Sequence, residues 1–129
     1  MDETLRKEGE AVRRRVLGDD YVDRATAGAD AFSAPLQDLL NEYCWGLGWT
    51  DDGLDLKQRS LLNLGMLAAS NRMHEFGIHF RGAMRSGLSG RELQAALLQI
   101  AIYCGVPAGV EACRVARAIR AEMGVEGAG

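Results

Sequence analysis

The informative absences in this 129-residue chain concern long apolar runs, targeting segments and an excess of one charge. No apolar run approaches the roughly 20 residues that a membrane-spanning helix requires. The first ten residues are charged from the second onward, so we expect no secretory signal peptide. A formal net charge of −3 gives no electrostatic reason to expect nucleic acid or an anionic membrane as a partner. These absences favour an ordinary globular protein of the cytoplasm.

Cysteine is also scarce, and its spacing excludes two kinds of site. The three cysteines, Cys44, Cys104 and Cys113, are widely spaced within helical patterns. They form no Cys-x-x-Cys pair and no Cys/His spacing suited to zinc, which argues against thiol redox chemistry and against a metal site. We therefore expect buried, reduced thiols.

Strand patterns are missing as well, because apolar residues recur almost everywhere with the helical period. The sequence predicts an all-α fold of six to seven helices in a single domain over residues 1–129. Its core covers about 9–123, and a flexible tail follows at 124–129. The first two predicted helices span Glu3–Leu17 and about 20–27. The third begins near Ser33 and is predicted to end at Gly46 and Gly48. Three further helices are expected at about 55–71, 72–85 and 90–104, and a last one carries Pro107 in its first turn and reaches about 123.

Three further patterns lead to expectations about packing. The stretch Leu61–Ala69 is apolar nearly all round, which indicates burial in a large core or against another subunit. Gly65, Gly77 and Gly82 interrupt helical patterns, which indicates close helix contacts or room for a ligand, and we favour close contacts. The run Arg13-Arg14-Arg15 is interpreted as a solvated helix face.

The candidate site is the stretch Asn71–His79, where an arginine, an acid and an imidazole recur at helical spacing. At 100° per residue, Arg72, Glu75 and His79 fall within a sector of about 60°. Apolar residues share this sector with the three ionisable groups. An ordinary solvated face would not carry these apolar residues, and an ordinary core face would not carry three ionisable groups. Blander interpretations stay open: Glu75 and His79 could form a surface pair, and Arg59 could simply pair with Asp55.

Several motifs together resemble 4-carboxymuconolactone decarboxylase. They are the string Asp55-Leu56-Lys57-Gln58-Arg59-Ser60-Leu61-Leu62, the pattern Asn71-Arg72-x-x-Glu75-x-x-x-His79, and the string from Leu98 to Ala108. The wider superfamily includes alkylhydroperoxidase D, whose Cys-x-x-Cys-x-x-x-His motif falls on Arg72, Glu75 and His79 here. That peroxidase's upstream glutamate falls on Ser60. The chain thus lacks the thiols and the relay acid, which argues against peroxidase activity.

The resemblance implies an alkylhydroperoxidase D-like helical fold that assembles as a ring-like homo-oligomer, a trimer or a hexamer. It also implies a cofactor-free reaction in aromatic (protocatechuate/β-ketoadipate) catabolism, the loss of CO2 from 4-carboxymuconolactone to give 3-oxoadipate enol-lactone. Alternatives are a paralogue that acts on a different small lactone or keto acid, and a non-catalytic oligomer that binds a small acid.

Roles for the residues follow from what this chemistry requires. Arg72 is our first choice to hold a substrate carboxylate and Arg59 our second, because a guanidinium binds a carboxylate through two donors. Ser60, or a backbone N–H near Gly105, could stabilise the oxyanion. His79 is the predicted proton donor, because an ordinary pKa near 6.5 leaves both of its forms available at neutral pH. Glu75 would orient His79 and keep it more often protonated, or supply the proton itself.

Overall fold

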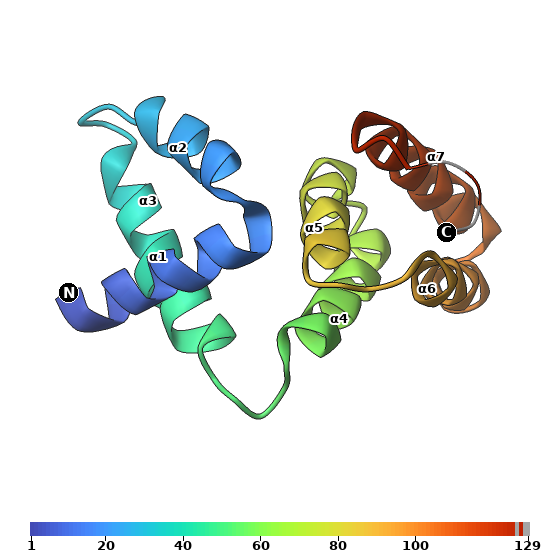
Figure 1. Ribbon diagram of the computed structural model, residues 1–129, viewed down its shortest axis with the longest axis horizontal. Coiled ribbons are helices and arrows are strands. Elements are labelled where there is room, and N and C mark those ends of the chain that lie inside the picture. Colours follow the sequence, from blue (N-terminus) through green and yellow to red (C-terminus); the bar gives the residue numbers. More distant parts are fainter. Residues whose placement is uncertain (126, 128–129) are drawn as a thin grey trace. The chain divides into compact units, whose positions relative to one another are not determined.

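The computed structural model describes residues 1–125 and 127, and in this part of the chain it contains helices and no strand (Figure 1). The all-α prediction is therefore confirmed. Two compact units are present, Met1–Leu56 and Lys57–Gly129, and each is described by itself. Part of the predicted flexible tail, residues 126, 128 and 129, lies outside the described residues. The predictions of a single domain and of a ring-like assembly stay predictions.

The first unit contains α1 (Glu3–Leu17), α2 (Asp19–Ala27), α3 (Ala34–Leu39) and the π-helix η1 (Leu40–Trp49). The side chain of Asp2 caps α1 by accepting a hydrogen bond from the backbone N–H of Leu5. The backbones of α1 and η1 approach closely at Gly9. A Cβ atom there would lie 1.8 Å from the carbonyl oxygen of Asn41 and 2.5 Å from the backbone nitrogen of Gly46. Only glycine fits at this contact.

The prediction that Gly46 and Gly48 end the third helix is wrong, because the chain continues helically through both to Trp49. The wider π-helical turn brings Asn41, Trp45 and Gly46 onto the buried side. Four large apolar residues of this stretch are exposed to solvent: Leu36 and Leu39 on α3, and Tyr43 and Leu47 on η1. The rings of Trp45 and Trp49 stack with their centres 4.6 Å apart.

The second unit contains nearly all of α4 (Leu56–Ala69), then α5 (Met73–Arg85), α6 (Gly90–Cys104) and α7 (Val106–Glu122). Its core is one cluster of apolar side chains from all four helices and from Leu88 in the connection between α5 and α6: Leu64, Ala68, Phe76, Phe80, Ala83, Leu88, Leu93, Ile100, Ala112 and Ala116. Gly87 adopts the left-handed conformation with φ 96°, and Ser89 and Glu92 form a capping box at the start of α6.

The two interpretations of the central glycines apply to different positions. At Gly77 an added Cβ would lie 3.2 Å from Cγ1 of Val115, so this glycine allows α5 and α7 to pack closely, as we expected. At Gly65 an added Cβ would meet nothing within 4 Å, so this position borders open space. Close contact therefore explains Gly77 but not Gly65.

Two expectations about burial are wrong. Arg13 is buried and does not belong to a solvated face, because it lies on the side of α1 that also buries Gly9 and Val16. Cys44 and Cys113 are exposed and not buried. On α4, Leu62 and Met66 are 53% and 51% exposed, because the core cluster covers only one side of this helix. The core of this unit therefore does not surround α4, and burial of Leu61–Ala69 against another subunit stays a prediction.

No helix among the described residues is both long enough and apolar enough to cross a lipid bilayer.

Candidate active site

Helix α5 places Glu75 and His79 one turn apart, as their spacing predicted. Phe76 and Phe80 from the same helix are fully buried, and their rings stack with centres 6.1 Å apart. His79 lies at the margin of this buried face and is largely shielded from solvent, whereas Glu75 is exposed. The imidazole is therefore held by a packed helix, with a carboxylate nearby on the solvent side.

Burial determines the charge of His79. It lowers the pKa of the imidazole to about 4, because the charged form loses its hydration. The charge of Glu75 acts in the opposite direction and raises the pKa, as we expected, but its effect is smaller. The expectation that both forms of His79 are available at neutral pH is therefore wrong for the free protein, in which the ring is neutral.

Arg72 lies just outside the helical segment that carries Glu75 and His79. Its predecessor Asn71 has a positive φ of 58°, and Arg72 itself occupies the N-cap position with φ −104° and ψ 69°. The predicted 60° sector assumed a continuous helix, and the backbone leaves helical geometry at these two residues. Arg72 thus stands at the start of α5 with an exposed side chain.

The remaining two candidates are neighbours on α4. Arg59 is half-buried, and Ser60 is buried with 1% of its surface exposed. The Oγ atom of Ser60 has no hydrogen-bond partner in the described part of the chain. A buried hydroxyl without a partner costs free energy, on the order of 1–3 kcal/mol. All five candidates belong to the second unit.

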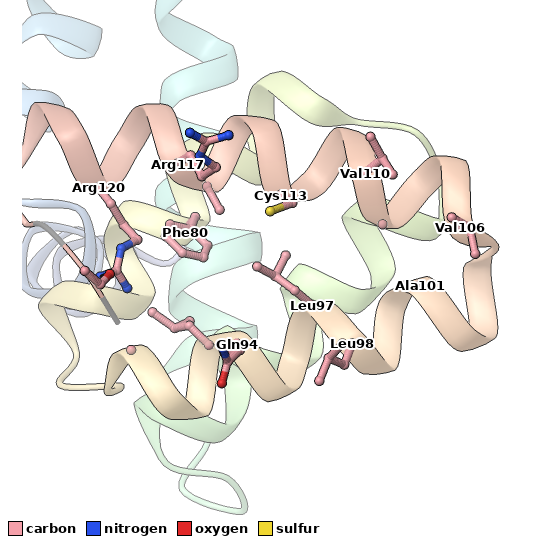
Figure 2. Close-up of a pocket in the computed structure, with 15 residues that line it drawn as sticks. Phe80, Gln94, Leu97, Leu98, Ala101, Val106, Val110, Cys113, Arg117 and Arg120 are labelled. Carbon is pink, nitrogen blue, oxygen red and sulfur yellow. The ribbon is translucent and has the colours of Figure 1, made fainter. Parts of the chain in front are cut away.

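The second unit also has two pockets that the sequence did not predict. One, of about 410 Å³, lies between α6 and α7, and Figure 2 shows Leu97 and Cys113 facing each other across it. Its lining is mainly apolar, with Gln94, Arg117 and Arg120 as larger polar side chains. The other, of about 450 Å³, is lined from α4 and α6 and includes Gly65.

None of the five candidate residues lines either of these pockets. Among the described residues, none that lines the pocket between α6 and α7 carries a carboxyl or imidazole group that could transfer a proton. We therefore retain the pair on α5 as the candidate catalytic group, because it combines an acid with an imidazole whose pKa is strongly shifted.

Arg13 is a buried ionisable residue that the sequence interpretation missed. The signal was present, because Gly9, Arg13 and Val16 recur at intervals of four and three residues on one face of α1. Its position within a run of three arginines concealed it.

Comparisons with known proteins identify the family. The model of the carboxymuconolactone decarboxylase family matches residues 34–118. The chain is 45% identical over 105 residues to a nitrosuccinic acid decarboxylase from Metarhizium robertsii, and the alignment covers 81% of this chain and 73% of that protein. It is 31% identical over 124 residues to 4-carboxymuconolactone decarboxylase from Acinetobacter baylyi, and this alignment covers 96% of this chain and 92% of that protein. The chain therefore belongs to the carboxymuconolactone decarboxylase family and is a carboxy-lyase.

Proposed function

We propose that this protein decarboxylates a small dicarboxylic acid without a cofactor, and that nitrosuccinic acid is its substrate. The observation that carries the proposal is the pair on α5, in which a largely buried imidazole follows a carboxylate by one turn. The choice of substrate is supported by the identity to the nitrosuccinic acid decarboxylase, which is 45% compared with 31% for the 4-carboxymuconolactone enzyme.

The chemistry of nitrosuccinate makes few demands on the protein. Its nitro group is attached to the carbon that bears one of the two carboxylates. When that carboxylate leaves as CO2, the bonding electron pair moves into the nitro group and forms a nitronate. A proton then adds to the same carbon, so that the products are CO2 and 3-nitropropanoate. The protein has to bind the carboxylates, stabilise the nitronate oxygens and deliver one proton.

The candidate residues can be assigned to these tasks. Arg72 and Arg59 bind carboxylates through paired donors. Ser60 donates a hydrogen bond to a nitronate oxygen, which supplies the acceptor that its hydroxyl lacks in the described part of the chain. His79 delivers the proton. Because the substrate is a dianion, its binding raises the pKa of His79 from about 4, and the ring takes up a proton from solvent. Glu75 acts on the ring in the same direction.

4-Carboxymuconolactone is the second candidate substrate. It is favoured by coverage, because the relative that bears this name aligns with 96% of the chain and over 92% of its own length. On loss of CO2 from this lactone, the electron pair moves through a double bond into the lactone carbonyl. Protonation then gives 3-oxoadipate enol-lactone, in the β-ketoadipate branch of aromatic catabolism. The same residues would take the same roles.

A side-by-side assay tests the proposal. The purified protein is incubated without added metal or thiol with nitrosuccinate or with 4-carboxymuconolactone, and CO2 release is measured. We expect turnover of nitrosuccinate with the higher kcat/KM. Turnover of the lactone alone would establish the second candidate. No CO2 from either acid would contradict both and would favour an acid-binding protein without catalysis.

We also propose that the protein is a homo-oligomer, a trimer or a hexamer, in the cytoplasm. Assembly is supported by the exposed apolar side chains of Leu62 and Met66 on α4, because contact between such side chains and water is unfavourable and a subunit interface would remove it. A cytoplasmic location is supported by three free cysteines, two of them exposed, since a reducing compartment preserves such thiols.

A further inference from the structure

Arg13 in the first unit is a buried cation to which the proposed reaction assigns no role. Only 4% of its surface is exposed. Burial lowers the pKa of its guanidinium, because a charge removed from water loses hydration. Since an arginine side chain ordinarily loses its proton only far above neutral pH, the group nevertheless stays charged at pH 7. A buried charge is costly unless an opposite charge or a full set of hydrogen bonds compensates it.

The partners of Arg13 in the described part of the chain are neutral. Its Nη1 atom donates to Oε1 of Gln37 at 2.9 Å and to Oδ1 of Asn41 at 3.1 Å. The nearby acid on the same helix, Glu10, pairs with Arg6 and Arg14 instead. Among the described residues no carboxylate forms an ion pair with Arg13. The two amides therefore hold one corner of the guanidinium without neutralising it.

The opposite edge of the guanidinium is the part without protein acceptors. The Nε atom is buried and has no hydrogen-bond partner among the described residues, and Nη2 donates to none of them. The Nε–H bond and one Nη2–H bond point in parallel along this edge. Their spacing matches the two oxygens of a carboxylate, which accepts both hydrogen bonds at once.

We propose that Arg13 is a carboxylate-binding residue, which holds a small carboxylate along its Nε–Nη2 edge while Gln37 and Asn41 fix the Nη1 corner. The carboxylate supplies the negative charge and the two acceptors that the first unit does not provide. The binding site itself is defined only by groups of the first unit and can be tested without turnover.

Nuclear magnetic resonance of the full chain gives the direct test, with succinate as the probe. Because the Nε–H of Arg13 is buried, we expect it to exchange slowly with water and to give a ¹⁵N signal that can be followed. We expect this signal to shift saturably with succinate and to stay unchanged with 1,4-butanediol, which has the same carbon chain without charge. No shift with succinate, or an equal shift with chloride, would overturn the proposal. If the signal changes on protein dilution instead, the anion at Arg13 belongs to a second copy of the chain, and this result too would overturn the proposal.

Two substitutions and a matched control test the site by affinity. Arg13→Gln removes the charge, and Arg13→Lys keeps the charge but removes the planar pair of donors. We expect each to weaken succinate binding at least about tenfold in calorimetry, as the loss of charge-assisted hydrogen bonds predicts. Arg15→Gln changes the net charge equally at an exposed position of the same helix, and we expect it to bind as the wild type does. Equal affinity in all four proteins would refute the proposal. Should the Arg13 variants not fold, the Nε signal of the wild type still decides.

The outcomes for this site and for the proposed function are separable. Succinate binding that depends on Arg13, without any CO2 release, would support the site and contradict the decarboxylation of the two acids. Turnover of either acid, together with an Arg13 signal that succinate does not perturb, would support the decarboxylation and contradict the site.

Discussion

His79 and Arg13 are ionisable side chains that lie on helix faces turned away from water, and burial lowers the pKa of both. The consequences differ because their ordinary pKa values differ. The imidazole becomes neutral at pH 7, so it needs a proton before it can act as an acid. The guanidinium stays charged, so it needs an anion. The same physical cause thus gives two different functional requirements.

The first prediction concerns the role of His79 in catalysis. His79→Ala should lower kcat at least about 100-fold, the lower limit of what a positioned proton donor contributes. Because the free ring has a pKa of about 4 and acts when protonated, kcat/KM should fall about tenfold per unit as pH rises from 5 to 8. Steady-state kinetics over this range measure both effects.

His74→Ala serves as the control, because this second histidine of α5 is exposed. We expect it to keep the wild-type rate and pH profile. Near-normal turnover by His79→Ala would remove the imidazole from the mechanism.

The second prediction concerns stability in acid. The folded pKa of His79 is about 4 and the unfolded value is about 6.5, so the unfolded chain binds more protons between these limits. The contribution of the neutral ring is therefore complete above pH 6.5 and is lost as pH falls to about 4, by up to about 3 kcal/mol. Urea unfolding of the wild type and of His79→Gln at several pH values measures it.

The free energy difference between the two proteins should change in favour of His79→Gln as pH falls. A difference that is constant from pH 7 to pH 4 would show that the buried ring does not govern acid stability.

At the scale of helices, glycines decide how closely two elements approach. In the first unit, Gly9 brings α1 into backbone contact with η1. In the second, Gly77 lets side chains of α7 reach the backbone of α5, directly before the turn that carries His79. The glycines therefore contribute to the position of functional side chains through helix packing and not through loop flexibility.

The third prediction tests the contact at Gly9. In Gly9→Ala the new methyl group would overlap the backbone at Asn41 and Gly46, which cannot move without separating the two helices. We expect a loss of about 3 kcal/mol or more in the free energy of unfolding, at the upper end of the cost of overpacking. Thermal or denaturant unfolding provides the measurement.

Gly48→Ala is the matched control within η1, because an added Cβ there meets nothing within 4 Å. It should leave stability unchanged or raise it by up to about 1 kcal/mol, the helix preference of alanine over glycine. Equal effects of the two substitutions would contradict the close contact.

At the scale of the whole molecule, each unit exposes apolar side chains that a solitary chain would leave in water. In the first unit they follow α3 and η1 and include Leu36 and Tyr43. In the second they include Leu62 and Met66 on α4, and Leu98 on α6 beside the pocket of Figure 2. Exposed apolar patches of this kind favour association.

The fourth prediction follows from this surface. Gel filtration with light scattering should give a mass well above the 14.0 kDa of one chain. Leu62→Glu with Met66→Glu should shift the protein toward the monomer, because charges cannot be buried without a partner at an interface. Arg91→Glu, at an exposed position of α6, is the control and should keep the wild-type mass. A wild-type protein that elutes as a monomer would contradict the proposed assembly.

The helical class, most helix boundaries and the Glu75–His79 pair could be predicted from the sequence. Spacing and capping are local properties: α1 begins at Glu3 and ends at Leu17 as predicted, and Ser89 and Glu92 cap α6. Predictions failed where the backbone left ideal α geometry. Arg72 has non-helical backbone angles at the N-cap of α5, and Tyr43 on the π-helix η1 is exposed.

What the sequence determined by itself is thus the succession of helices and the chemical groups that they carry, because periodicity and caps depend on neighbours along the chain. Tertiary structure alone decided the charge state of His79 and the burial of Arg13. Both depend on how much water surrounds a side chain, and helices from distant parts of the sequence exclude that water. For this reason Arg13, in a run of three arginines that the sequence suggested was solvated, is a buried cation in the fold, whereas Arg15 is exposed.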